Sequence, residues 1–155
     1  MTVVEAGIRI QAPRERIFDI SQDYAIRKRW DPFSRATGLL DDARWAALGV
    51  RAFVRARNGF QMTFKYVQYR RPERAAIVMI DGPWFFEKFA GTWIFEPAAD
   101  GGTLVRFRYS FVARPVSLRS PLEELIRRVL QRNTEARLPA LKRYCESQCA
   151  QAPDG

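Results

Sequence analysis

Two tyrosines and one asparagine are the polar side chains that fall where this sequence predicts apolar surfaces. Tyr66 and Tyr109 belong to the apolar sides of alternating segments, and Asn133 belongs to the apolar stripe of a C-terminal helical pattern. A polar group in such a place needs a hydrogen-bond partner, which is a ligand, a water or the backbone. The sequence contains no histidine, which excludes a catalytic triad of the usual form. Any catalysis would depend on tyrosine, arginine, aspartate or glutamate.

Glu87 and Asp31 are the two acidic candidates. Alternation through Phe89 and Gly91 places Glu87 on their face, where a buried carboxyl group would be suited to proton transfer. A bulge at Gly91 would reverse that register and turn Glu87 to the opposite face. We favour a position of Glu87 near solvent, at the end of the strand. Asp31, in the aromatic turn 30–33, is either a carboxylate at a cavity entrance or the cap of the turn, and we favour the cap. The acids do not form a convergent set.

Cys145 and Cys149 are four residues apart, so on a helix they would lie on one face, one turn apart. A zinc site would need further ligands, and a sequence without histidine offers no recognisable set. We therefore interpret both as reduced thiols. The sequence also lacks a glycine-rich phosphate loop and a dinucleotide fingerprint. We predict neither a metal nor a cofactor.

The length and composition predict one domain with a well-formed core, since 47% of the 155 residues are hydrophobic. We expect this domain to cover residues 1–150 and residues 151–155 to form a disordered tail. No apolar run approaches the roughly 20 residues that cross a bilayer. The N-terminus lacks the features of a signal peptide, so the expected location is cytoplasmic.

The chain is basic, with 26 Lys and Arg against 17 Asp and Glu and a net charge of +9. Such a balance permits attraction to nucleic acid or to an anionic membrane. The positive residues are nevertheless spread from Arg9 to Arg143, which favours an ordinary solvated surface. We do not expect a nucleic-acid partner, whereas transient contact with a membrane surface and the oligomeric state stay open.

The elements that must position these residues follow from periodicity. Residues 3–10 predict a strand, Pro13 begins a short helix, and a second short helix is expected over 24–29. From Gly49 the period is two, and Asn58-Gly59 indicates a two-residue hairpin. The strands expected from there lie within 50–56, 60–66, 75–80, 85–96 and 103–113. Together they predict an antiparallel sheet that is apolar on one face.

A long C-terminal helix from Ser120-Pro121 is predicted to cover the apolar face, with a kink at Pro139. Its inward stripe is predicted to be Leu122, Ile126, Val129, Asn133, Ala136, Ala140 and Tyr144. A bent helix on a curved sheet does not pack tightly along its whole length. We therefore expect a cavity between them.

Several motifs resemble the START-like, or SRPBCC, superfamily, close to polyketide cyclase/dehydrase and lipid-transport proteins. The matching segments are Ile8–Pro13 with Ile17-Phe18, Asp23-Tyr24, Trp30-Asp31-Pro32, Gly91–Pro97 and Asp100–Thr103. The resemblance implies an α+β helix-grip fold. In that fold a curved seven-stranded antiparallel sheet wraps around a long C-terminal helix, and two short helices follow the first strand. Fold alone does not imply function.

The predicted cavity lining follows from strand parity and helix spacing. The candidates are Val54, Phe64, Tyr66, Met79, Trp93, Phe95, Phe107, Tyr109, Ile126, Val129 and Asn133. For each one, ordinary core packing is the alternative. The leading hypothesis is binding or transport of a small hydrophobic molecule such as a lipid or polyketide. The alternatives are a cyclase or aromatase that uses cavity Tyr, Glu or Asp residues, and a protein that acts through its basic surface.

Overall fold

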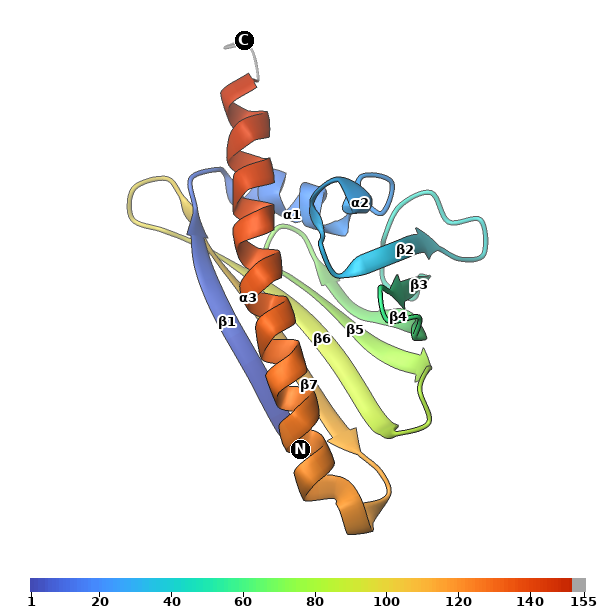
Figure 1. Cartoon of the computed structure of the whole chain (residues 1–155). Coiled ribbons are helices and arrows are strands. Elements are labelled where there is room, and N and C mark those ends of the chain that lie inside the picture. The colour runs from blue at the N-terminus through green and yellow to red at the C-terminus, as the bar shows by residue number, and fades with distance from the viewer. Residues whose placement is uncertain (152–155) are drawn as a thin grey trace.

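A curved antiparallel sheet and one long helix make up most of the structure, a computed structural model that describes residues 1–151 (Figure 1). In chain order the elements are β1 (Thr2–Ile10), α1 (Arg14–Gln22), α2 (Arg27–Trp30), β2 (Ser34–Leu39), β3 (Arg51–Ala56), β4 (Gln61–Arg70), β5 (Arg74–Asp81), β6 (Phe86–Pro97), β7 (Thr103–Ala113), a 3₁₀ turn (Val116–Leu118) and α3 (Arg119–Gln151). Apart from Gln151, which ends α3, the predicted disordered tail lies outside the described residues.

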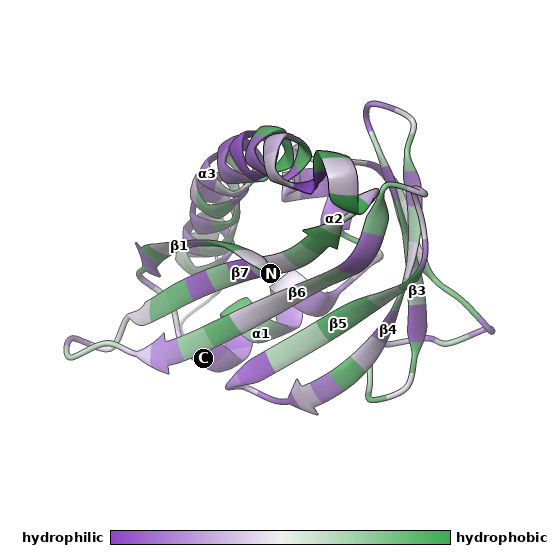
Figure 2. Cartoon of the chain, turned by 90° about the horizontal axis from the view of Figure 1, so that it is seen from below, coloured by the Kyte–Doolittle hydropathy of each residue, from purple (hydrophilic) through white to green (hydrophobic). Residues whose placement is uncertain are grey.

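The seven strands form one sheet in the order β1-β7-β6-β5-β4-β3-β2, and each neighbouring pair is antiparallel. Alternation in β7 explains its two faces: Val105, Phe107 and Tyr109 are buried, whereas Arg108 is exposed. Register shifts in β2, β4 and β6 add the local bends that curl the sheet around α3 (Figure 2). The helix-grip fold predicted above is confirmed.

Helix α3 is anchored near both ends and spans the concave face between them. Near its start, Glu123 accepts hydrogen bonds from the Thr2 hydroxyl (2.6 Å) and the Ala113 amide (2.9 Å). Near its end, Glu146 accepts a hydrogen bond from the Gln11 amide (3.0 Å). Between these two ends α3 packs against β1 and β7.

The inward stripe of α3 differs from the predicted one. Leu130, Leu138 and Leu141 are at most 5% exposed, whereas Val129 is 48% exposed and Ala136 is also exposed. The prediction followed three- and four-residue steps; Ile126 is buried as predicted, but burial of three leucines releases more free energy than burial of small and polar residues and sets the rotation of the rest of the helix. α3 is also continuous through Pro139, although a kink was predicted there (Figure 1).

Short-range hydrogen bonds changed two predicted boundaries. The Asp23 carboxylate accepts the Ala25 amide (2.9 Å), so the residues before Arg27 form a turn instead of the first part of a helix. At the β3–β4 hairpin the loop has three residues, because the Gly59 amide bonds to the Ala56 carbonyl (3.0 Å) and Gly59 takes a φ of 92°. Strand β2 was not predicted individually, since its sequence SRATGL has no clear alternation.

Within residues 1–151, no helix combines the length and hydropathy needed to cross a membrane.

Candidate functional site

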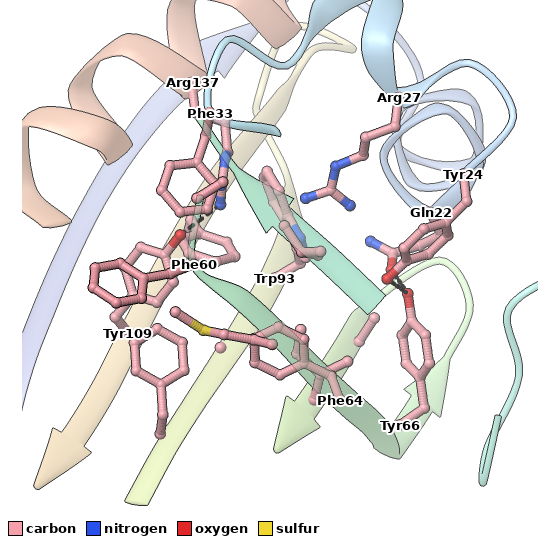
Figure 3. A pocket seen from close by; sticks show the side chains of 18 residues that line it. Gln22, Tyr24, Arg27, Phe33, Phe60, Phe64, Tyr66, Trp93, Tyr109 and Arg137 are labelled. Carbon is pink, nitrogen blue, oxygen red and sulfur yellow. Dashed lines mark hydrogen bonds between the residues drawn. The ribbon is translucent and has the colours of Figure 1, made fainter. Parts of the chain in front are cut away.

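A narrow cavity lies between the concave face of the sheet and the middle of α3 (Figure 3). Its volume is ≈ 40 Å³, counted as the space open to the centre of a water-sized sphere. About 10–15 Å³ of such space holds one water molecule, so this closed arrangement has room for a few waters. Phe60, in the turn directly before β4, lines the cavity and is also 45% exposed. Phe60 therefore marks the mouth.

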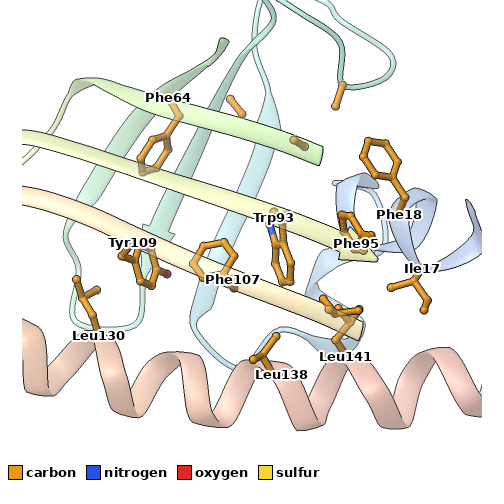
Figure 4. Close-up of a cluster of buried hydrophobic side chains, with 14 of the residues drawn as sticks. Ile17, Phe18, Phe64, Trp93, Phe95, Phe107, Tyr109, Leu130, Leu138 and Leu141 are labelled. Atoms are coloured by element: carbon orange, nitrogen blue, oxygen red, sulfur yellow. The ribbon is translucent and has the colours of Figure 1, made fainter. Parts of the chain in front are cut away.

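Six of the predicted lining residues lie on the cavity wall. They are Val54, Phe64, Tyr66, Trp93, Phe107 and Tyr109. All six come from β3, β4, β6 and β7, where alternate residues share one face of the sheet. Their rings pack closely: the centroid of Phe107 is 4.5 Å from that of Trp93 and 4.5 Å from that of Tyr109 (Figure 4). Whether these residues contact a ligand stays a prediction.

Five predicted lining residues do not border the cavity. Phe95 is buried but packs beyond the cavity, against Phe18 and Trp93. Met79 is half-buried near Gly82, at the far end of β5. The remaining three, all on α3, are Ile126, Val129 and Asn133. The rotation of α3 explains Val129 and Asn133, because it turns Leu130 and Arg137 inward instead, whereas Ile126 is buried in the core away from the cavity.

Glu87 does not occupy a buried position. The register of β6 against β7 shifts between Phe86 and Lys88, so Glu87 falls in a bulge and its side chain leaves the aromatic face. It is exposed and forms an ion pair with Arg119 at 2.8 Å. The bulge lies between Phe86 and Lys88 and not at Gly91. Its effect is the one anticipated for a bulge, because it moves Glu87 off the face of Phe89 and Gly91. The favoured position of Glu87 near solvent is confirmed, and the alternative of a buried general acid was wrong.

A first polar cluster on the cavity wall joins the end of α1 to β4. The Tyr66 hydroxyl donates to Gln22 Oε1 at 2.7 Å and lies 3.1 Å from the Tyr24 hydroxyl (Figure 3). Burial and the neighbouring Tyr24 raise the pKa of Tyr66 well above its usual value. Tyr66 is therefore a neutral phenol, which can donate or accept a hydrogen bond but is not a ready base.

A second polar cluster contains two arginines and one aspartate, all nine-tenths or more buried. The carboxylate of Asp31 accepts from Arg27 Nε (2.9 Å) and from Arg137 Nε (3.4 Å). It also accepts the Phe33 amide (2.9 Å), which is the turn-capping contact favoured from the sequence. Arg137 Nη1 in turn donates to the Tyr109 hydroxyl at 2.8 Å. Asp31 is thus behind the cavity wall and not at an open entrance.

The charge states of this cluster follow from its contacts. Burial acts to raise the pKa of Asp31, but the positive charges of Arg137 and Arg27 and the hydrogen bonds lower it to about 2. Burial disfavours the charge of Arg27, yet attraction to Asp31 keeps its pKa above the usual value. Burial also raises the pKa of Tyr109. At neutral pH the aspartate is ionised and the phenol is neutral.

Sequence reasoning missed Arg27, Arg137 and Gln22. The arginines were assigned with the others to a solvated surface, but Arg27 is 7% exposed and Arg137 is 3% exposed. The four-residue spacing of Arg27 and Asp31 was a usable signal for a helical ion pair. Arg137 directly precedes Leu138, which belongs to the buried leucine stripe of α3. A prediction that had chosen this stripe as the inward face of the helix would also have placed Arg137 inside the protein.

The two cysteines are free thiols, Cys145 buried and Cys149 half-buried. Burial, with a smaller contribution from Cys149, raises the pKa of Cys145 to about 12, which makes it a poor nucleophile and a poor metal ligand. Within the part of the chain that the structure describes, no three His, Cys, Asp or Glu residues are grouped so that they could hold a metal ion.

Residues 1–146 match the model of the family described as polyketide cyclase/dehydrase and lipid transport. The chain belongs to this family. No curated protein matches the chain in sequence.

Solved structures of similar proteins agree with this fold. The Zhui aromatase/cyclase from a Streptomyces species is 20% identical, with a TM-score of 0.77 over 99% of this chain and 98% of that one. A START superfamily protein from Mycobacterium smegmatis is 14% identical, with a TM-score of 0.76 over 94% and 98%. A protein from Thermus thermophilus is 21% identical, with a TM-score of 0.79 over 97% and 100%. At these identities the likeness shows a shared fold.

Proposed function

We propose that the protein binds a small, largely apolar molecule in the cavity between the sheet and α3. The observation that carries this proposal is the composition of the cavity wall, which is mostly aromatic and aliphatic and is interrupted by two buried polar clusters. Small-molecule sites commonly have this composition, because apolar contact supplies affinity and a few polar groups set the orientation. The family description, which includes lipid transport, is consistent with the proposal.

Binding requires the cavity to widen, since ligand cavities usually measure about 300–1,000 Å³. The β3–β4 hairpin is the segment that we expect to move. Phe60 there packs edge-to-face on Phe85 at 5.4 Å, and both side chains belong to turns between strands and not to the centre of the sheet. Separating such an aromatic pair costs only about 0.5–1.5 kcal/mol beyond the exposed area. Movement of the hairpin tip would open the mouth.

The first test compares the mass of the purified protein under native and denaturing conditions. A discrete excess that is lost on denaturation identifies a retained ligand by its mass. The second test titrates the protein with N-phenyl-1-naphthylamine, a neutral apolar fluorophore. We expect saturable fluorescence enhancement as the probe enters the cavity.

A matched pair of variants assigns the binding to the cavity. Val54→Trp adds a bulky ring to the cavity wall and is expected to weaken probe binding about tenfold or more. Val67→Trp adds the same ring at a half-exposed position of β4 outside the cavity, and it should bind like the wild type. Circular dichroism confirms that both variants are folded. Unchanged probe affinity in folded Val54→Trp would contradict the proposal.

A second candidate function is a cyclase or aromatase reaction. The observation that favours it is the pair of polar clusters, which hold the phenols of Tyr66 and Tyr109 and the guanidinium of Arg137 against the cavity. Such groups could hold a flexible polyketide in a folded pose and stabilise an enolate. The test is the product profile of a linear poly-β-ketone with and without protein. Identical profiles would leave binding alone as the function.

A further inference from the structure

We infer that the bound molecule carries a carboxylate, which lies in the cavity between Arg27 and Arg137 while an apolar chain extends toward Phe60. The inference rests on the proposed binding function and names the chemical class of the ligand. It comes from three features of the second polar cluster: its charge balance, its unused hydrogen-bond donors and its aromatic surroundings.

The charge balance of the cluster is positive. Arg27 and Arg137 are the charged residues on the cavity wall. Among residues 1–150, the carboxylate of Asp31 behind that wall forms an ion pair with each of them. Two guanidinium groups and one carboxylate leave a net charge of +1 in a site that is almost closed to solvent. Buried charge is costly unless it is paired. One monoanion would neutralise the site.

Each arginine also has donors left over. Arg27 uses Nε for Asp31 and Nη1 for the Ser21 carbonyl (3.4 Å), and Arg137 uses Nε for Asp31 and Nη1 for Tyr109. Within residues 1–150, neither Nη2 atom makes a hydrogen bond, and neither is fully enclosed by protein. Figure 3 shows both guanidinium groups directed into the cavity from opposite sides of Trp93. The free N–H groups therefore face the space that a ligand would fill.

Aromatic rings compensate only part of this charge. The Arg137 guanidinium lies 4.9 Å from the ring of Phe33 and 5.2 Å from that of Phe107, and Arg27 lies 5.3 Å from the ring of Trp30. Cation–π contacts attract a guanidinium, but they accept no N–H hydrogen bond of normal strength. A carboxylate supplies both the negative charge and two acceptor oxygens in the plane that a guanidinium prefers.

The rest of the cavity wall determines the chemistry of the remaining part of the ligand. Phe64, Trp93 and Phe107 line the same cavity as the two arginines and as Phe60 at the mouth, and they make most of its wall apolar. A neutral apolar molecule would fill this wall but leave the arginine donors unsatisfied, and a cationic one would be repelled. The site therefore fits an amphiphile such as a medium-chain fatty acid or a carboxylate-ended polyketide, with its charged end innermost.

The test compares three probes of equal chain length, decanoate, decanol and decylamine, by isothermal titration calorimetry at neutral pH. We expect decanoate to bind at least about tenfold more tightly than decanol, because hydrogen bonds to charged groups are the strong ones. Decylamine should bind more weakly than decanol. Equal affinity for decanoate and decanol would overturn the inference while leaving the binding function intact. Failure of all three probes, together with no binding of the neutral fluorophore, would overturn both.

Variants locate the carboxylate. Arg137→Gln and Arg27→Gln each leave one arginine paired with Asp31, so the site becomes neutral and we expect both variants to fold. Each should lose most of the tenfold preference for decanoate while retaining decanol binding. The control Arg128→Gln removes an exposed arginine of α3 and should keep the preference. A preference that persists in folded Arg27→Gln and Arg137→Gln would overturn the inference, whatever the control shows.

Discussion

At the scale of single residues, Asp31 is the side chain on which most of the site depends. Its carboxylate caps the turn through Phe33 and pairs with Arg27 and Arg137. Because it lies behind the cavity wall with both oxygens occupied, it has no free acceptor for substrate. Its role is to position the two arginines, and its removal should affect folding before it affects any chemistry.

Asp31→Asn should destabilise the protein by about 3–5 kcal/mol, because two buried guanidinium groups lose their carboxylate. The pH dependence separates this effect from simple loss of packing. A carboxyl group with a pKa of about 2 when folded and near 3.8 when unfolded stabilises the protein above the unfolded value, and this stability is lost as pH falls toward 2. The difference between the folded and unfolded pKa values of Asp31 corresponds to about 2 kcal/mol of free energy of unfolding.

Urea denaturation of both proteins at pH values from about 5 to 2 measures this difference. The wild type should lose about 2 kcal/mol more than Asp31→Asn over that interval. The half-buried carboxylates with lowered pKa values, such as Glu5 and Glu146, contribute equally to both proteins and cancel in the comparison. Parallel stability curves for the two proteins would show that Asp31 is not the titrating group.

At the scale of secondary-structure elements, strands were predicted better than helices. In β4 and β7 the period of two allows only two choices of face, and the aromatic residues decide between them. In β6 strict alternation alone would have placed Glu87 on the aromatic face, but a bulge inserts one residue there, and the favoured position of Glu87 near solvent was correct. The bulge thus keeps the only glutamate candidate out of the site, although nothing in the local sequence marks where the extra residue is inserted.

Helix α3 offered several overlapping apolar stripes, and the sequence alone did not decide among them. The predicted stripe placed Val129 and Asn133 inside and so left Arg137 outside. In the structure Leu130, Leu138 and Arg137 face the sheet instead. The arginine is accepted there because Asp31, from a segment more than a hundred residues earlier in the chain, supplies its partner. That pairing is tertiary and has no signature within the helix.

Adjacent residues of α3 test its rotation. Leu130→Ala should destabilise the protein by about 2–5 kcal/mol, because Leu130 is 5% exposed and its loss leaves a cavity. Val129→Ala, one residue away and 48% exposed, should change stability by no more than about 0.5 kcal/mol. Chemical denaturation of both variants gives the two values. Comparable losses, or a larger loss for Val129→Ala, would mean that the helix is rotated differently.

At the scale of the whole molecule, the charge is arranged in two ways. Many surface arginines are paired with acidic residues, as in the contacts of Arg51 with Asp41 and of Arg71 with Asp19. Arg27 and Arg137 are instead buried beside the cavity. Most of the net charge of +9 therefore belongs to residues outside the cavity. The cavity has a small positive charge of its own.

These two arrangements predict different responses to salt. Attraction of a dispersed basic surface to vesicles rich in anionic lipid is screened over about 10 Å at 0.1 M salt, so any such binding should fall steeply between about 50 and 200 mM. Binding of decanoate between two buried arginines is screened much less and should change by less than about threefold over the same range. Vesicle co-sedimentation and calorimetry measure the two in parallel. If decanoate binding fell as steeply as vesicle binding, the carboxylate would be held by surface arginines, and the third function considered for this chain, action through its basic surface, would replace the cavity as the leading one.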